Sequence, residues 1–168
     1  MEEFINKDQL KLKLIAWYEI AGGFLGLCLV IWLIATTGTI TGITLLIFAL
    51  AIGLYSFSIF CGIQLFKNPL KLGLTISIIN QILQIINFSI FGLGYKYIAG
   101  ILITFGIDYT SALKSTMNFS VSTFQIIINQ EKEVFTVGIN IVAAFLAYSL
   151  DKLKNKTELI SQAPKIQS

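Results

Sequence analysis

The stretch GITLLIFALAIGLYSFSIFCGIQLF, residues 42–66, contains no charged residue, and it decides the class of fold. As an α-helix this stretch would rise about 38 Å, more than the hydrocarbon core of a bilayer, which is about 30 Å thick. The whole chain agrees, because 55% of its 168 residues are hydrophobic and 12% are charged, against about 25% charged residues in an ordinary soluble domain. We therefore predict an integral membrane protein whose apolar surface is covered by lipid.

Three further apolar runs extend this prediction to an α-helical membrane bundle. Four transmembrane helices are expected, over residues 14–35, 42–66, 70–92 and 134–150. The first run is longer than a signal-peptide core of about 7–15 residues, so we expect it to be retained. The last run is at the short end of spanning length. The chain is predicted to be a single membrane domain, residues 1–168, with a disordered tail over residues 157–168.

Residues 94–133 do not follow the helical pattern. Residues 97–107 are too few to span a bilayer as a helix and are rich in β-branched and aromatic types. Further on, polar and apolar residues alternate as in a strand: Met117, Asn118, Phe119, Ser120, Val121 and Ser122. We predict a small external β-meander inserted between the third and fourth helices. A re-entrant or interfacial segment over residues 97–107 is the alternative.

Lysines indicate the orientation, because positive charge near helix ends stays in the cytoplasm. With four spans, one side would carry nine of the 12 basic residues: Lys7, Lys11, Lys13, Lys67, Lys71, Lys152, Lys154, Lys156 and Lys165. The other side would carry Lys96, Lys114 and Lys132, balanced by acidic residues. The chain also lacks arginine and uses much isoleucine, which is typical of an A/T-rich bacterial genome. We predict a multi-pass protein of the bacterial inner membrane with both termini in the cytoplasm.

Polar side chains recur along the third helix at spacings of three and four residues, which places them on one helix face. Together with polar residues at comparable depth they form a candidate intramembrane polar site: Glu19, Gln64, Ser77, Asn80, Gln84 and Asn87, with Gln81 beside that face. Interhelical hydrogen bonds worth ~0.6–2 kcal/mol each are one interpretation. A polar pathway or ligand site is the other.

Glu19 is the ionisable residue placed within a span, and intramembrane carboxylates are costly and often functional. The alternative is an interfacial glutamate paired with Lys13, Lys67 or Lys71. On the same helix, Gly22 and Gly26 have the spacing that lets two helices approach closely, so they are predicted packing residues.

In the external segment, Asp108 and Tyr109 are the candidate residues. An interfacial tyrosine belt and a turn at the end of a strand are the simpler interpretations. Because a short external sheet has exposed edges, this segment is also a candidate for binding a partner strand.

The hairpin from Phe57-Ser-Ile-Phe-Cys-Gly-Ile-Gln-Leu-Phe-Lys67 to Gln84 resembles one found in uncharacterised small bacterial multi-span membrane proteins. In those proteins an apolar helix ends in Gly-apolar-x-Leu, a basic turn follows, and a second helix starts at once. The resemblance implies a topology and no activity.

The sequence offers no catalytic set. It has no histidine, no phosphate-binding loop, no metal-type cysteine spacing and no paired carboxylates at a defined spacing. We therefore expect no enzyme activity, no cofactor, no metal and no nucleic-acid partner. The leading prediction is a subunit or accessory factor of a membrane complex, which binds a protein partner or further copies of itself through the external β segment. A small oligomeric channel or transporter that uses the polar face of the third helix and Glu19 is the alternative.

Overall fold

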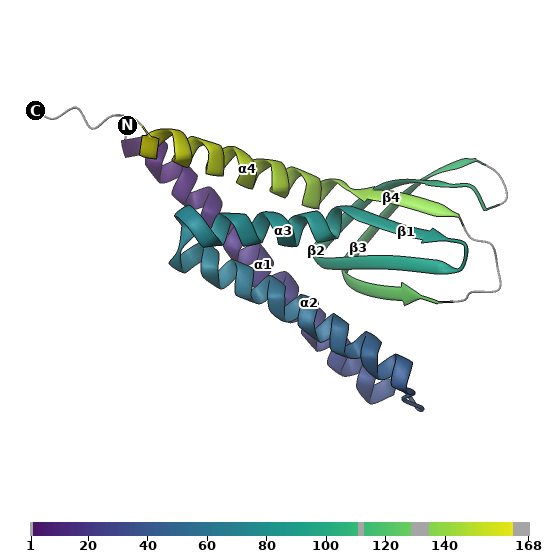
Figure 1. The fold of residues 1–168 in the computed structure, drawn as a ribbon. Coiled ribbons are helices and arrows are strands. Elements are labelled where there is room, and N and C mark those ends of the chain that lie inside the picture. Colours follow the sequence, from purple (N-terminus) through teal and green to yellow (C-terminus); the bar gives the residue numbers. More distant parts are fainter. Residues whose placement is uncertain (1, 111–112, 129–134, 163–168) are drawn as a thin grey trace, which may run out of the picture.

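The computed structural model describes residues 2–110, 113–128 and 135–162, which contain four α-helices and four strands. The helices are α1 (Glu2–Thr36), α2 (Gly42–Lys67), α3 (Leu74–Ile85) and α4 (Ile141–Gln162), with a π-helical segment, η1 (Pro69–Gly73), between α2 and α3. The strands are β1 (Ile86–Ile90), β2 (Leu93–Asp108), β3 (Lys114–Ile127) and β4 (Thr136–Asn140). An antiparallel sheet between the third and fourth helices is therefore confirmed (Figure 1). The predicted meander is wrong, because β4 lies between β1 and β2, and the external position of the sheet stays a prediction.

The helices α1 and α2 form a long antiparallel hairpin that projects away from the rest of the molecule (Figure 1). Both are long and apolar enough to cross a membrane, over Asp8–Thr36 and Gly42–Lys67. Only 28% and 17% of their most apolar stretches are buried, so most of that surface needs an apolar environment. Gly26 allows the close approach of the two helices, since a Cβ atom there would lie 2.0 Å from the ring of Tyr55.

The third and fourth predicted spans are wrong in length. The helix α3 has 12 residues, and residues 86–90 of the predicted span form β1. Phe91 and Gly92 follow with φ of 49° and 79°, and two residues with positive φ make the tight turn of a hairpin to β2. Residues 136–140 belong to β4, so α4 begins only at Ile141. Two candidate spans, in α1 and α2, replace the four predicted within the described residues.

Two smaller predictions are also settled. Residues 97–107 lie within β2, so the re-entrant alternative is wrong. The helix α4 continues to Gln162, so residues 157–162 of the predicted disordered tail are helical, while residues 163–168 lie outside the described part of the chain.

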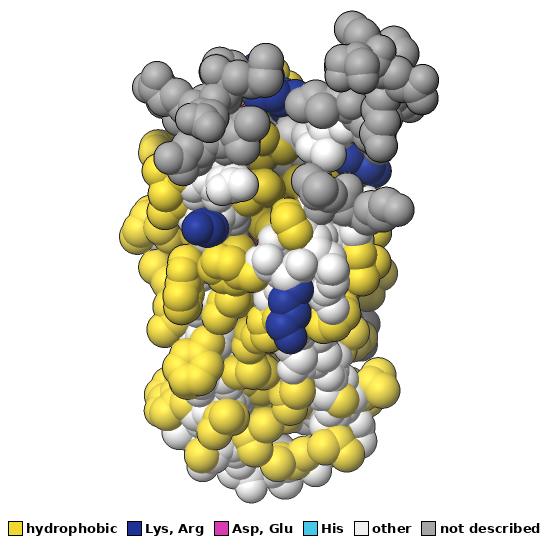
Figure 2. Space-filling model, turned by 90° about the vertical axis from the view of Figure 1, so that its left-hand side faces the viewer, with side chains coloured by type: hydrophobic (Ala, Val, Ile, Leu, Met, Phe, Trp, Pro, Cys, Tyr) yellow, Lys and Arg dark blue, Asp and Glu magenta, His cyan; other side chains and the backbone are white. Residues whose placement is uncertain are grey.

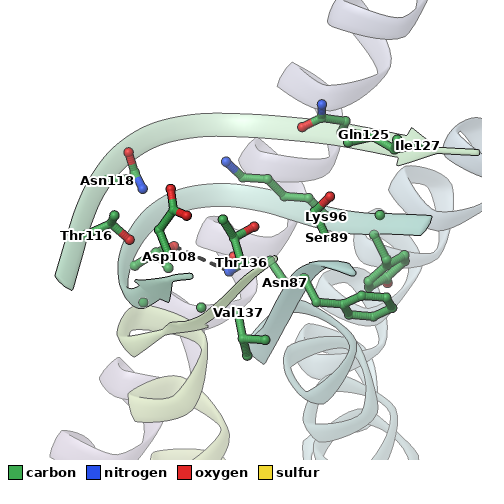
Figure 3. A pocket seen from close by; sticks show the side chains of 16 residues that line it. Asn87, Ser89, Lys96, Asp108, Thr116, Asn118, Gln125, Ile127, Thr136 and Val137 are labelled. Carbon is green, nitrogen blue, oxygen red and sulfur yellow. Dashed lines mark hydrogen bonds between the residues drawn. The ribbon is translucent and has the colours of Figure 1, made fainter. Parts of the chain in front are cut away.

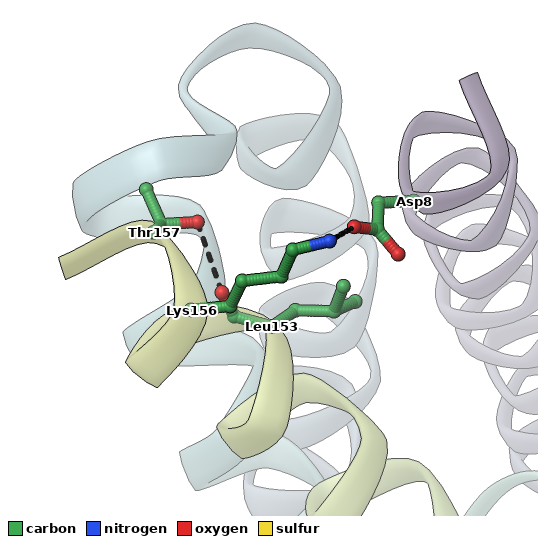
Figure 4. Close-up of polar contacts among 4 residues, drawn as sticks. All are labelled: Asp8, Leu153, Lys156 and Thr157. Carbon is green, nitrogen blue, oxygen red and sulfur yellow. Dashed lines mark hydrogen bonds and ion pairs between the residues drawn. The ribbon is translucent and has the colours of Figure 1, made fainter. Parts of the chain in front are cut away.

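The start of α1 and the end of α4 lie at the same end of the molecule (Figure 1). Near the end of α4, the Lys156 ammonium pairs with the Asp8 carboxylate of α1 (Figure 4). One turn away, Leu153 packs into a buried cluster with Ile15 and Leu65. Figure 2 views the molecule from this end and shows lysine side chains over a mainly apolar surface. These contacts explain why the α4 helix extends beyond the apolar run.

The four-stranded sheet has the order β1-β4-β2-β3, with an additional pairing between β1 and β2. Residues 93–95 of β2 run antiparallel to β1, and residues 104–108 run antiparallel to β4. Since β1 and β4 are antiparallel to each other, β2 must reverse its direction between these two parts. The partner strand β3 follows β2 through this reversal, so the hairpin of β2 and β3 is folded back on itself and curves the sheet.

The reversal occurs where the register of β2 and β3 shifts, between Ile98 and Ile101. Gly100 has a φ of +116° there, and Ser122 opposite has a φ of 29°. The bend rests on the middle of α1, where a Cβ atom on Gly22 would lie 2.5 Å from the backbone of the bend. Tyr18 of α1 accepts a hydrogen bond from the N–H of Ile101 at 2.9 Å. The bend is therefore held by the helix on which it lies.

We predict that Gly100→Ala lowers stability, whereas Gly53→Ala does not. At position 100 the positive φ alone costs about 1–3 kcal/mol for an L-residue, and the added Cβ would meet the Tyr18 ring at 2.4 Å. A Cβ atom added at Gly53 would meet no atom within 4 Å outside its own stretch of helix. Alanine at this position should therefore gain about 0.5–1 kcal/mol of helix stability. Thermal unfolding of both variants in the same detergent is the measurement. Equal melting temperatures for the two variants would show that the bend does not require glycine at position 100.

Candidate functional site

The carboxylate of Glu19 lies in the middle of α1 and is fully buried. It accepts three hydrogen bonds from α3: from Ser77 Oγ at 2.7 Å, from Asn80 Nδ2 at 3.0 Å and from Gln81 Nε2 at 2.9 Å. The donors face α1 together because Asn80 and Gln81 follow Ser77 by three and four residues, about one helical turn. A buried carboxylate is tolerated only when it is hydrogen-bonded, and here α3 supplies the donors.

Asn80 extends these contacts to α2. Besides Glu19, its Nδ2 donates to Ser58 Oγ at 3.2 Å, and Ser58 Oγ in turn donates to the backbone oxygen of Glu19 at 3.0 Å. A single amide of α3 is therefore bonded to both α1 and α2. It fixes the three helices at one point of contact.

The same contacts reach the sheet. Gln84 Nε2 donates to Asn80 Oδ1 at 3.3 Å, and Gln84 Oε1 accepts from the backbone N–H of Ala99, in the bend of β2, at 2.7 Å. We call the connected polar residues the Glu19 network: Glu19, Ser58, Ser77, Asn80, Gln81 and Gln84. It joins three helices and one strand through hydrogen bonds.

The structure brings together four of the six predicted polar-site residues and leaves two apart. Gln64 lies near the end of α2, where Gln64 Oε1 accepts from Asn68 Nδ2 at 3.0 Å. Asn87 lies on β1, because α3 ends at Ile85 and the helical spacing no longer applies beyond it. Lys13 and Lys67, two of the three predicted partners of Glu19, form no ion pair with it among the described contacts. The side chain of the third, Lys71, lies outside the described part of the chain.

The other predicted residues, Gly22, Gly26, Asp108 and Tyr109, lie in packing contacts or near a turn. Gly26 lies against a helix, but Gly22 lies against the β2 backbone and not against a helix. Asp108 Oδ1 accepts from the Thr110 N–H at 2.8 Å, and these contacts with Thr110 hold the pKa of Asp108 below its ordinary value. Tyr109 donates its N–H to Phe135 O at 2.9 Å. Both lie at the strand end and turn that the sequence indicates.

Ser58 and the bend-holding Tyr18 and Ser122 were not predicted. Ser122 Oγ accepts from Gly100 N and donates to Gly22 O, both at 3.1 Å. A single hydroxyl residue inside an apolar helix or an alternating strand carries no signal of its partner. These roles depend on contacts between residues far apart in the chain.

The Glu19 network lies in the buried contact between the helices and the sheet. Its side chains are buried, and they hydrogen-bond to one another and to the backbone. Within the described part of the chain, no group of three or more His, Cys, Asp or Glu side chains could hold a metal ion. The arrangement is suited to fixing the helices against the sheet. A pathway through this site stays a prediction.

A separate polar cavity of about 330 Å³ lies within the curved sheet (Figure 3). All four strands line it, with polar side chains and small residues: Asn87 and Ser89 of β1, Lys96, Thr104 and Asp108 of β2, Thr116, Asn118 and Gln125 of β3, and Thr136 and Gly138 of β4. Phe88, Tyr95, Ile127 and Val137 also line it. Other alternate residues of the strands are apolar and exposed outside the cavity, among them Phe105, Ile107, Met117, Phe119 and Ile139. The cavity is therefore mainly polar, and the outer surface of the sheet is mainly apolar.

We predict that Asn80→Leu destabilises the protein and that Gln64→Leu does not. Leucine at position 80 removes the donors to Glu19 and Ser58 and the acceptor for Gln84. Each buried polar group left without a partner costs about 1–3 kcal/mol. Gln64 lies outside the network, so its replacement should change the free energy of unfolding by less than about 0.5 kcal/mol. Unfolding in mixed micelles measures both, and equal losses would show that the network has no special role.

No protein-family model, no curated protein and no solved structure matches this chain.

Proposed function

We propose that this chain is a non-enzymatic subunit of a membrane complex, anchored by α1 and α2, and that it binds a second copy of itself through β3. The observation that carries the proposal is the outer edge of β3. Among the described strands, β3 pairs with β2 alone, so one edge of Lys114–Ile127 has no partner strand. Unpaired strand edges are sites where further strands add.

The composition of β3 favours such pairing. Protected edges usually carry charges or proline, but Lys114–Ile127 contains one charged residue, at its first position, and no proline. Met117 and Phe119 are 67% and 72% exposed on its outer face. Lipid tails cannot satisfy the hydrogen bonds of a strand edge, and water does not favour the apolar face. A partner strand would satisfy the hydrogen bonds of the edge, and its side chains would pack beside Met117 and Phe119 on the same face.

The β3 strands of two copies can pair with each other. An antiparallel pair of identical strands obeys two-fold symmetry, so the same patch is used twice. Such a pair would place the two Lys114 side chains at opposite ends of the joint sheet, so that like charges stay apart. The central residues, near Val121, would then face each other.

Phe119→Lys should convert the dimer to a monomer, because it replaces an apolar side chain of the paired stretch, two residues from the central Val121, by a charge in each copy. Leu159→Lys, at an equally exposed position of α4 (70%), is the matched control and should leave the dimer intact. Light scattering and native mass spectrometry in mild detergent measure the mass. A monomeric parent protein, or a dimer that survives Phe119→Lys, would contradict the proposal. Quenching of a probe at position 119 by labelled lipid would assign this face to the bilayer instead.

The proposed location is the bacterial inner membrane, with both termini in the cytoplasm and the sheet outside. The lysine-bearing start of α1, the turn between α2 and α3 and the end of α4 lie at one end of the molecule (Figure 1), which agrees with the positive-inside rule. With Cys28 and Cys61 replaced by alanine, we expect Thr110→Cys to react with an impermeant maleimide in spheroplasts. Asn155→Cys should react only after lysis. Reaction of both positions from the same side would refute this topology.

A further inference from the structure

Lys96 gives the polar cavity of the sheet its positive charge. Among the described residues that line the cavity, no other carries a positive charge. Lys96 is partly buried, and burial lowers the pKa of its ammonium group because the charged form loses solvent. Figure 3 shows its side chain extended along the cavity, on the inner side of the sheet with Asn118 and Asp108. No described carboxylate lies within ion-pair distance of Lys96.

Asp108, the acidic residue of the same lining, already has a role elsewhere. It is at the end of β2, where it accepts the N–H of Thr110 in the turn. Its charge interaction is with Lys114, the first residue of β3. The positive charge of Lys96 is therefore not balanced by the acidic residue of this cavity.

Ser89 is a second, independent sign of a ligand. Its side chain lines the cavity from β1, it is 8% exposed, and its hydroxyl has no hydrogen-bond partner among the described residues. The strand register pairs Ser89 with Gly94, two residues before Lys96 on the same face of β2. A buried hydroxyl normally has a partner, so an acceptor at this position is expected from outside the chain.

We propose that the inner cavity of the sheet binds a small oxyanion, a phosphate or carboxylate group, held by the Lys96 ammonium and the Ser89 hydroxyl. The Gln125 side chain comes from the residue that pairs with Lys96 across β2 and β3, and with Asn87 it adds amide donors to the same lining. Lysine binds phosphate as a point charge, and hydroxyl and amide groups complete such sites. A volume of about 330 Å³ is within the range of small-ligand sites. The group can belong to a soluble anion or to a lipid headgroup.

Titration calorimetry on the full chain in non-ionic detergent tests the proposal, at constant ionic strength because salt screens charges. The probes are inorganic phosphate, acetate and short-chain phosphatidylglycerol, with short-chain phosphatidylcholine for comparison. We expect saturable binding of at least one anionic probe. Preference for inorganic phosphate or acetate assigns a soluble ligand, and preference for phosphatidylglycerol assigns a lipid.

Three variants complete the test. Lys96→Gln should weaken binding at least tenfold and Ser89→Ala several-fold. Lys152→Gln, which removes the same charge from an exposed residue of α4, should bind like the parent protein. Melting temperatures check that all variants are folded, and Lys96→Gln should melt no lower than the parent because it removes a desolvated charge. Absence of binding to every anionic probe, or equal affinities for Lys96→Gln and the parent protein, would overturn the proposal.

Discussion

At the bend of β2, three consecutive backbone N–H groups donate to side chains of other elements, and the rest of the molecule depends on these hydrogen bonds. Gln84 of α3 accepts from Ala99, Ser122 of β3 accepts from Gly100, and Tyr18 of α1 accepts from Ile101. Buried donors without partners are costly. The sheet can therefore fold back on itself only against this pair of helices. Its curvature and the polar cavity that it encloses follow from that contact.

Glu19 constrains the packing of the helices in a similar way. Its buried carboxylate needs donors, and the α3 face supplies two amides and a hydroxyl. The same face supplies Gln84 to the bend one turn further on. Since one short helix serves both the carboxylate and the bend, the position of α3 against α1 also fixes the position of the sheet. The hydrogen bonds of this polar face of α3 therefore determine how the helices and the sheet pack together.

The sequence predicts those features that repeat along the chain. Ser77, Asn80 and Gln84 share a helix face because their spacing is helical, and residues 117–121 form a strand because they alternate. The prediction fails at Asn87, where the spacing continues although the helix has ended. Nothing local marks that end, because isoleucines on both sides of it suit a helix or a strand. The partners of Tyr18 and Ser122 lie about 80–100 residues away, which no periodicity can reveal.

The third and fourth predicted spans have wrong bounds for one geometric reason. The helix α3 passes directly into β1 and β4 passes directly into α4, and Ile86 pairs with Ile139 where both changes occur. Asn140 ends β4 and its Oδ1 caps the next helix, accepting from Val142 N at 3.1 Å. The change from α3 to β1 and the change from β4 to α4 therefore lie side by side, and neither needs a loop. The outer faces of helix and strand are both apolar, so hydropathy continues through the change without a break. The length of an apolar run therefore gives the length of the continuous outer surface and not the length of a helix. The change from helix to sheet is visible only on the inner face, where Asn87, Thr136 and Gly138 line the polar cavity.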